Sequence, residues 1–450
     1  MNYFNTEDTI CAITTGGGMS AIAIIRISGK NAIKITNSVF SKDISDSKTH
    51  TLHFGNFTYN KEVIDEILVS IFRGNKSFTG EESVEISCHG SVYIQNKILQ
   101  ILIKNGCRLA TAGEFSMRAF KNGKLDLTQA ESVADLIESE SEAAHKTAFM
   151  QLKGGISGKL KKLRNQLIDF ASLIELELDF SEEDVEFADR EKFNDLLENI
   201  KSELKKLIQS FKLGNSIKNG IPVTILGAPN VGKSTLLNCL LNEDKSIVSD
   251  IAGTTRDAIE DTLIIDGYNF RFIDTAGIRN TTDTIENLGI EKTLEKANKS
   301  DIILFIIDAS QKLESQIVEL NKVRKDNSAK VLVIVNKIDV SNIELNENYI
   351  PISAKNGEGV STLKNKLLNF IDTEKISDND SIVSNLRHYE QLQLTLLEIK
   401  SITDGLESGI SGDFLSINIR QALFHLGSIT GEVTTDNLLA NIFGKFCIGK

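Results

Sequence analysis

The segment from Gly227 to Ser234 reads GAPNVGKS, with glycines, a lysine and a serine at the spacing of a phosphate-binding loop. It follows the apolar run IPVTIL and precedes TLLNCLL, so it lies between an expected strand and an expected helix. Glycines let backbone N–H groups surround phosphate oxygens, and the start of the helix adds partial positive charge. We therefore expect Lys233 to reach the β- and γ-phosphates of a nucleotide and the Ser234 hydroxyl to bind Mg²⁺.

Two later stretches supply groups for the γ-phosphate. The polar loop SIVSDIAGTTRD contains Thr254 and Thr255, which offer a second hydroxyl for Mg²⁺. DTAG begins with Asp274, which ends an expected strand and can hold a water molecule on Mg²⁺. Gly277 is free to turn its N–H toward the γ-phosphate. The order of these motifs disfavours the alternative that GAPNVGKS is only a glycine-rich turn.

The motif NKID selects the base. The carboxylate of Asp339 can accept hydrogen bonds from two guanine N–H groups at once, whereas adenine lacks that pair of donors. Leaving such a buried charge unpaired can cost ~10⁴-fold or more in discrimination. Ser353, Ala354 and Lys355 follow a short expected strand and can close over the base. The sequence therefore predicts GTP rather than ATP as the ligand.

The predicted nucleotide contacts come from five stretches of chain. They are Asn230, Val231, Gly232, Lys233, Ser234, Thr235, Ser249, Asp250, Ile251, Ala252, Gly253, Thr254, Thr255, Asp274, Thr275, Ala276, Gly277, Asn336, Lys337, Asp339, Ser353, Ala354 and Lys355.

Ile278 follows DTAG at the position where small Ras-like GTPases carry a glutamine that orients the attacking water. A GTPase that lacks both this glutamine and an arginine finger loses about 10³–10⁵-fold in rate. The motif block resembles the translation-factor-related bacterial GTPases. Another group must supply the positive charge and position the water.

Three regions of different texture position these residues. From Asp8 to about Leu125, apolar runs expected to be strands (Ala21–Ser28, Glu66–Gly74 and Val84–Gly90) and one helical pattern predict a small α+β domain. From Leu127 to about Leu213 the spacing is helical, and the same texture returns from about Ser381 to Leu439. Between these helical blocks, strands alternate with helices, as in a doubly wound parallel sheet.

The predicted fold is a multidomain α/β and α+β chain, in which a Ras-like P-loop G domain is inserted into a helical domain. The expected segments are 1–123 for the α+β domain, 124–219 and 375–450 for the two parts of the helical domain, and 220–374 for the G domain.

Composition is that of a globular protein, with 450 residues, 41% hydrophobic and 25% charged. The net charge of −12 argues neither for nor against nucleic acid, because local basic patches decide such binding. Five scattered cysteines without CxxC spacing disfavour zinc and disulfides. The N-terminus lacks a signal-peptide pattern and no apolar run reaches about 18 residues, so we expect a cytoplasmic protein without membrane spans.

Five sequence blocks carry a resemblance to one family. They are FTGEE (Phe78–Glu82), GEFSMRAFKNGKLDLTQAE (Gly113–Glu131), GTTRD, ITGEVTTDNLL (Ile429–Leu439) and the terminal FCIGK (Phe446–Lys450). Together they resemble, over essentially the whole chain, the tRNA-modification GTPases called MnmE or TrmE, within the TrmE-Era-EngA-YihA-Septin-like superfamily.

The resemblance implies a folate-binding N-terminal domain through which two copies form a homodimer. It also implies a heterotetramer with the FAD-dependent partner MnmG (GidA). The complex adds an aminomethyl or carboxymethylaminomethyl group to C5 of the wobble uridine (position 34) of certain tRNAs. A 5-formyl- or methylene-tetrahydrofolate supplies the one-carbon unit.

The resemblance also implies how hydrolysis proceeds without the glutamine. Two G domains dimerise across their nucleotide faces, and K⁺ takes the place of an arginine finger. The implied K⁺ ligands are Asn230, Ser249, Ile251 and Thr254. The implied Mg²⁺ ligands are Ser234 and Thr255. Lys233, Thr255 and Glu286 are the implied catalytic residues, with Glu286 positioning the water indirectly; without the resemblance, Glu286 is an ordinary surface residue.

For the folate, the resemblance implies Arg26, Glu85, Lys124 and Lys450, which are otherwise ordinary salt-bridge residues. A carboxylate suits pterin N–H groups and a basic side chain suits the glutamate tail. Cys447 is either a nucleophile near that site or a packed C-terminal cysteine.

Other interpretations stay open at this point. The lysine-rich stretch from Lys146 to Arg164, which contains no acid, is either a tRNA or partner surface or a solvated helix face. The alternative functions are an RNA-binding GTPase switch in ribosome assembly and a folate-transfer protein regulated by its G domain.

Overall fold

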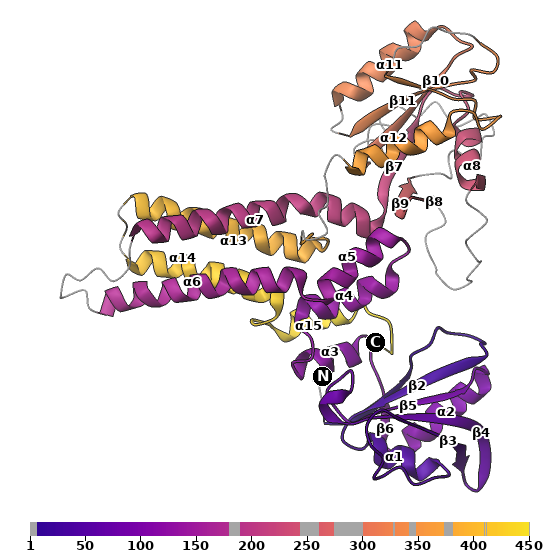
Figure 1. Cartoon of the computed structure of the whole chain (residues 1–450), viewed down its shortest axis with the longest axis vertical. Helices are drawn as coiled ribbons and strands as arrows, with labels where there is room; N and C mark the ends of the chain where they lie inside the picture. Colours follow the sequence, from indigo (N-terminus) through magenta and orange to yellow (C-terminus); the bar gives the residue numbers. More distant parts are fainter. Residues whose placement is uncertain are drawn as a thin grey trace. The chain divides into compact units, whose positions relative to one another are not determined.

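The computed structural model describes residues 7–179, 190–243, 261–273, 300–326, 329–341, 348–372, 381–408, 410 and 412–449. The chain divides into two compact units, each drawn from separated stretches of sequence (Figure 1). The first unit comprises Met1–Glu138, Ala148–Leu204 and Glu390–Lys450, and the second comprises Ser139–Thr147 and Lys205–Tyr389.

A six-stranded sheet forms the N-terminal part of the first unit. Its strands are β1 (Thr9–Ile13), β2 (Ile22–Ser28), β3 (Thr51–Tyr59), β4 (Glu62–Phe72), β5 (Ser83–His89) and β6 (Cys107–Leu109). Their order is β3-β4-β5-β2-β1-β6, and neighbours are antiparallel except for the parallel pair β1 and β6. A short 3₁₀ turn, η1 (Gly74–Lys76), follows β4.

The two faces of this sheet differ in character. Helices α1 (Ala32–Val39) and α2 (Val92–Lys104) pack on one face, where alternate apolar residues of β2, β4 and β5 form the core. Arg26 and Glu85 face the other side and are only half-buried. By register, the exposed side chains of Phe54 and Leu68 share that second face. The period-2 alternation of the strands thus leaves an open polar and apolar face.

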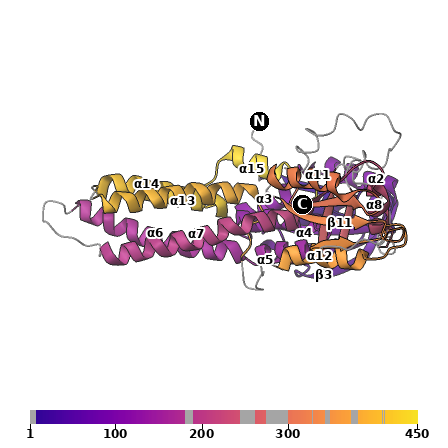
Figure 2. The same cartoon turned by 90° about the horizontal axis from the view of Figure 1, so that it is seen from above.

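Helices make up the rest of the first unit, in part shared with the second. They are α3 (Glu114–Lys121), α4 (Leu127–Glu138), α5 (Glu142–Leu152), α6 (Gly155–Asp179), α7 (Arg190–Asn219), α13 (Leu386–Glu407), α14 (Gly412–Thr430) and α15 (Asp436–Phe443). Helix α6 lies alongside α14 (Figures 1 and 2). The helical spacing predicted up to about Leu213 includes α7, where Leu197, Ile200 and Leu204 lie on one buried face.

The C-terminal tail returns to the N-terminal part of the chain. Ile448 forms a β-bridge with Ala112, and the Gly113 N–H donates to the Cys447 carbonyl at 3.4 Å. Gly113 has φ 64°, and a Cβ there would stand 2.5 Å from the Phe443 carbonyl oxygen, so this junction requires glycine. The residues of FCIGK therefore lie beside the start of α3.

The second unit contains a sheet of order β12-β11-β10-β7-β9-β8. Its elements are β7 (Ile221–Leu226), α8 (Lys233–Glu243), β8 (Asp261–Ile265), β9 (Tyr268–Phe272), β10 (Ile302–Asp308), α11 (Leu313–Asp326), β11 (Lys330–Asn336), β12 (Tyr349–Pro351) and α12 (Val360–Asp372). All pairings are parallel except the hairpin of β8 and β9. Apolar clusters cover both faces of the sheet, as a doubly wound fold requires.

The predicted fold class is confirmed: a Ras-like G domain is inserted between helical segments that follow a small α+β sheet domain. Within the parts of the chain that the structure describes, no helix is both long enough and apolar enough to cross a membrane.

Candidate functional site

The phosphate-binding loop joins β7 to α8 through three residues in the left-handed backbone region. Gly227 has φ 146°, Asn230 φ 63° and Gly232 φ 100°. A Cβ on Gly232 would collide with the Asn336 amide nitrogen, and one on Gly227 would collide with the Ile306 carbonyl. Both glycines are thus required by neighbouring backbone and side chains, whereas asparagine tolerates the left-handed region unaided.

Lys233 lies inside this loop at the start of α8. Its ammonium donates to the carbonyl oxygens of Gly227 at 2.8 Å and Ala228 at 3.1 Å. The ammonium thus donates to loop carbonyls that phosphate oxygens of a bound nucleotide would replace. Ser234 and Thr235 follow in the first turn of α8, half-buried and exposed respectively. The helix N-terminus, the lysine and the serine hydroxyl therefore gather at one point, as an anion site requires.

Asn336 connects the phosphate-binding loop to the base-binding segments. Its side chain is buried, its amide nitrogen donates to the Val231 carbonyl at 2.8 Å, and its amide oxygen accepts from the Ala354 N–H at 3.0 Å. Asn336 therefore binds Val231, which lies 105 residues before it in the sequence, and Ala354, which lies 18 residues after it.

Asp339 lies beside the segment from Ser353 to Lys355. The Ser353 hydroxyl donates to Asp339 Oδ1 at 2.8 Å. Ser353 is buried, and Ala354 is buried next to it, while Lys355 is exposed. The NKID and SAK segments therefore meet at Asp339 and Ser353, and the exposed Asp339 carboxylate stays accessible to a ligand.

Lys337 is tied down by an acid that sequence reasoning missed. Its ammonium donates to the Asn230 carbonyl at 2.9 Å and to Asp308 Oδ2 at 2.7 Å. Burial raises the pKa of Asp308, but hydrogen bonds from Lys337 and Ser310 outweigh it, so the pKa lies below its ordinary value. The available signal was position, since Asp308 ends a buried parallel strand at the same sheet edge as the phosphate-binding loop.

Many predicted residues lie outside the described residues. They are Ser249, Asp250, Ile251, Ala252, Gly253, Thr254, Thr255, Asp274, Thr275, Ala276, Gly277, Ile278, Glu286 and Lys450.

A second group of predicted residues is the one assigned to the folate site. Two of its members, Arg26 and Glu85, lie on the open face of the N-terminal sheet. Arg26 and Glu85 face each other across β2 and β5 and form an ion pair at 2.9 Å. The Arg26 guanidinium also lies over two aromatic rings, 5.3 Å from the centroid of Phe78 and 5.5 Å from that of Phe115. The pair is partly open to solvent, with exposed side-chain fractions of 22% and 25%. It offers a carboxylate and a guanidinium side by side.

The other two described residues of this group are held separately. Lys124 donates to the Asn75 carbonyl at 2.6 Å. Cys447 is exposed, so the structure does not show the packed C-terminal cysteine considered above. The Cys447 carbonyl accepts a hydrogen bond from the Gly113 N–H. Gly113 lies two residues before Phe115, so the tail contacts the segment that leads to one of the two rings beside Arg26.

The basic stretch after Lys146 is partly neutralised. Lys161 pairs with Asp126 at 3.3 Å, and Arg164 pairs with Glu432 at 2.6 Å. Lys153 lies over the ring of Phe149 at 4.4 Å. The solvated-face interpretation gains from these pairs, and a nucleic-acid surface here stays a prediction.

Comparison with known proteins places the whole chain. Residues 127–447 match the model of the MnmE helical domain, and residues 9–124 match that of the GTP-binding protein TrmE N-terminus. The chain is 54% identical over 459 residues to the tRNA modification GTPase MnmE of Flavobacterium psychrophilum, covering 99% of both chains. It is 52% identical to the protein of that name from Flavobacterium johnsoniae and 51% identical to that of Christiangramia forsetii, again over 99% of this chain and of each relative.

These matches include both the G-domain motifs and the N-terminal and C-terminal blocks. The resemblance drawn from FCIGK and the GEFSMRAF block is therefore confirmed: this chain belongs to the MnmE (TrmE) family of tRNA modification GTPases.

Proposed function

We propose that this chain hydrolyses GTP and, with an FAD-dependent partner, serves the addition of an aminomethyl or carboxymethylaminomethyl group to C5 of the wobble uridine of certain tRNAs. The observation that carries the proposal is the pair of links made by Asn336 and Lys337. These side chains join the phosphate-binding loop to the base-binding segments in a member of the MnmE family.

The described residues divide the work of nucleotide binding. Lys233 exchanges its two loop carbonyls for phosphate oxygens and neutralises their charge. Asp339, oriented by Ser353, accepts from the guanine edge. Asp308 holds Lys337 in place, and the Lys337 ammonium also donates to the Asn230 carbonyl of the phosphate-binding loop.

The residues present fit the two cations that the family implies. Ser234 presents a hydroxyl oxygen at the loop, the kind of ligand that Mg²⁺ prefers. Asn230 is exposed in a left-handed backbone conformation, so its side chain can offer an amide oxygen to K⁺ on the nucleotide side. Bound K⁺ would supply the positive charge that an arginine finger supplies elsewhere. Thr255, Ser249, Ile251 and Thr254 complete these sites in the proposal, and Glu286 positions the water.

The Arg26 and Glu85 pair fits a tetrahydrofolate carrying a formyl or methylene group. Glu85 can accept from pterin N–H groups, and Arg26 can bind a carboxylate of the glutamate tail. Both side chains stay partly exposed, so a ligand can reach them. Lys124 and Lys450 are proposed as further folate contacts, and Cys447 is a candidate nucleophile on the exposed tail.

Two exposed apolar surfaces support protein partners. The open face of the N-terminal sheet exposes Leu52, Phe54, Val63 and Leu68, which suits a homodimer formed through this domain. Leu394, Leu397, Ile417 and Phe424 are exposed on α13 and α14, which suits a second protein, in the proposal the MnmG subunits of a heterotetramer in the cytoplasm.

The cation proposal is tested on the purified chain by comparing GTP hydrolysis in KCl and NaCl at equal ionic strength. We expect K⁺ to raise the rate about 10-fold or more, because charge at the transition state is worth that much. Asn230→Gly should abolish the stimulation while keeping the left-handed backbone, which alanine would strain.

The matched control is Asn60→Gly, a second exposed asparagine with positive φ, which lies in the turn between β3 and β4. It should keep the full K⁺ response. Equal rates in the two salts, or an unchanged response in Asn230→Gly, would contradict the proposed cation site.

A further inference from the structure

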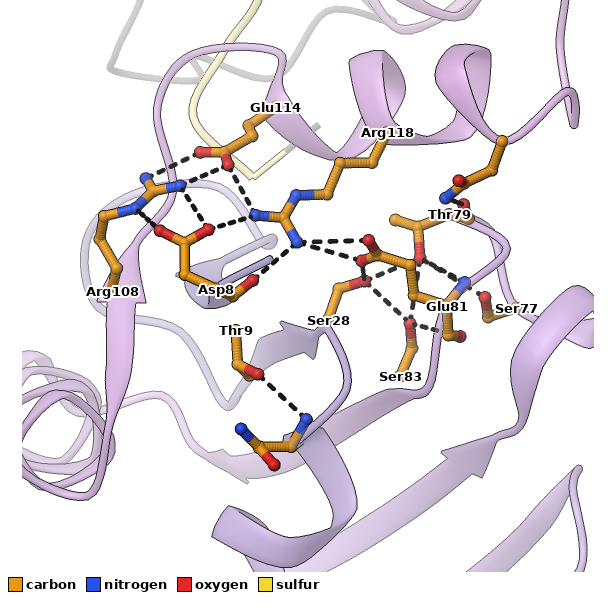
Figure 3. Close-up of polar contacts among 12 residues, drawn as sticks. Asp8, Thr9, Ser28, Ser77, Thr79, Glu81, Ser83, Arg108, Glu114 and Arg118 are labelled. Carbon is orange, nitrogen blue, oxygen red and sulfur yellow. Dashed lines mark hydrogen bonds and ion pairs between the residues drawn. The ribbon is translucent and has the colours of Figure 1, made fainter. Parts of the chain in front are cut away.

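Arg118 is a completely buried charge at the centre of the N-terminal domain. It lies on α3, and its side chain has no exposed surface. One guanidinium nitrogen contacts Asp8 Oδ1 and Glu114 Oε1, each at 3.0 Å, and the other contacts Glu81 at 3.2 Å and the Asp8 carbonyl at 2.9 Å. Figure 3 shows Arg118 between these acids, with Asp8 and Glu114 on one side and Glu81 on the other.

A second arginine completes the network. Arg108 donates to Asp8 Oδ2 at 2.6 Å and to Glu114 Oε1 at 2.6 Å (Figure 3). The hydrogen bond from Arg108 lowers the pKa of Asp8. Burial raises the pKa of Glu114, but hydrogen bonds from Arg108, the Thr111 N–H and Arg118 outweigh this effect. The pKa of Glu114 therefore lies below its ordinary value. Both carboxyls are therefore ionised at neutral pH.

Such a network adds little to stability compared with apolar side chains of the same volume, because desolvation offsets the Coulomb attraction. Breaking one contact, by contrast, is strongly destabilising, because it leaves a buried charge without its partner. The segments that it joins are the start of β1, the loop before β5, and α3. The question is what these segments must hold in place.

Two acids of the network, Glu81 and Glu114, lie close in sequence to the two rings beside Arg26. These rings, Phe78 and Phe115, form what we call the Arg26 cradle. Glu114 is followed by Phe115, and Glu81 lies three residues after Phe78 in FTGEE. Glu81 is also fixed by the Ser28 hydroxyl at 2.7 Å (Figure 3). Glu81 and Glu114 thus bind the same guanidinium, and each lies close in sequence to one of the two rings.

The loop is tied to α3 at a second point. The Asn122 amide at the end of α3 donates to the Thr79 carbonyl at 2.7 Å. Thr79 and Glu81, which both follow Phe78 in the loop, are therefore bound to residues in or next to α3, while Phe78 itself is 37% exposed.

We propose that Arg118 is a positioning residue for the Arg26 and Glu85 pair: by holding Glu81 and Glu114 together, it keeps Phe78 and Phe115 at the distance that orients the Arg26 guanidinium. This role rests on the proposed folate site. It assigns to FTGEE and GEFSMRAF a shared function, which is to preset the ligand-facing arginine from behind.

The chain contains no tryptophan, so Phe78→Trp gives a single fluorescent reporter in the cradle. In that background, Glu81→Ala removes the contact with Arg118, and the matched control Glu82→Ala removes a neighbouring acid that pairs instead with Arg73 at 3.4 Å. The full-length variants are compared by emission maximum without ligand, by Kd for 5-formyl-tetrahydrofolate, by thermal midpoint and by GTPase rate.

We expect Glu81→Ala to shift the emission to the red and to raise Kd about 10-fold, which is the effect of losing one charged hydrogen bond. Glu82→Ala should change Kd less than about twofold, and neither variant should alter the GTPase rate. Arg118→Lys, which keeps the charge but cannot bridge both acids, should reproduce Glu81→Ala if it folds.

The outcomes separate the two levels of the proposal. Identical emission and identical Kd in the Glu81 and Glu82 variants would overturn the positioning role. A red shift in Glu81→Ala in a protein that binds no folate, with or without the reporter, would support the positioning role and contradict the folate site instead. A red shift accompanied by an equal loss of thermal midpoint in both variants would also overturn it, since a general packing defect then explains the change.

Discussion

In the proposed function, the base specificity of the G domain depends on one carboxylate, that of Asp339, and on the Ser353 hydroxyl that binds it. Ser353 fixes Asp339 Oδ1, and Asn336, three residues earlier, ties the same segment to the phosphate-binding loop. The guanine edge would therefore meet a carboxylate whose position is set before the nucleotide arrives. Preset groups of this kind discriminate strongly, because a wrong base leaves them unpaired.

We predict that Asp339→Asn weakens GTP binding about 10²-fold or more and gains xanthosine triphosphate, since the amide replaces one acceptor by a donor. Nucleotide titrations with both triphosphates check this. Asp266→Asn is the control, because Asp266 lies exposed in the turn of β8 and β9, where asparagine tolerates its φ of 48°. GTP affinity retained by Asp339→Asn would refute the base contact.

At the scale of elements, the sequence predicts what short patterns specify. The strand, glycine loop and helix around GAPNVGKS are consecutive, so their structure follows from local spacing. The three-residue strand β6 went unrecognised, because it is stabilised by β1, a partner almost 100 residues away, rather than by its own alternation. The same holds for Arg118 and Asp308, whose roles depend on partners brought close only by the fold.

The buried acids make the N-terminal domain sensitive to low pH. The pKa of Glu114 is lowered in the folded chain, so its contribution is complete above its ordinary pKa of about 4.5 and is lost as the pH falls through the lowered value. We predict that Glu114→Gln lowers the free energy of unfolding at pH 7 by about 3 kcal/mol, because it leaves both arginines underpaired. Urea titrations at pH 7 and pH 3.5 should show this difference shrinking at the lower pH.

Glu66→Gln is the control for this titration series. Glu66 is exposed on β4, so its substitution should change the free energy of unfolding by no more than about 0.5 kcal/mol at either pH. A difference between wild type and Glu114→Gln that is as large at pH 3.5 as at pH 7 would show that the lost ion pairs are not its cause.

At the scale of the whole molecule, the two compact units share helices. The division between them falls inside α7, after Leu204, and inside α13, after Tyr389. Within the second unit, the rings of Phe211 on α7 and Tyr389 on α13 stack with centroids 4.3 Å apart. Both helices continue covalently from the second unit into the first, and this ring pair joins them within the second unit.

We predict that Phe211→Leu leaves GTP hydrolysis by the purified chain within about twofold but lowers tRNA modification several-fold, in line with coupling energies of about 0.5–2 kcal/mol. Leucine keeps most of the volume and removes the stacking. Tyr93→Leu on α2, where the residue is 70% exposed and belongs to no proposed site or partner surface, is the control and should affect neither readout. Equal loss of hydrolysis and modification in Phe211→Leu would place its effect in the G domain itself.

The most direct test of the proposed function is the mass spectrum of wobble-uridine nucleosides in tRNA from a strain that lacks this chain. We predict that deletion removes the C5 aminomethyl or carboxymethylaminomethyl nucleoside, that the wild-type chain restores it, and that Asp339→Asn does not, because it no longer retains GTP. A nucleoside profile unchanged by the deletion would contradict the account and favour a GTPase that acts elsewhere, as in ribosome assembly.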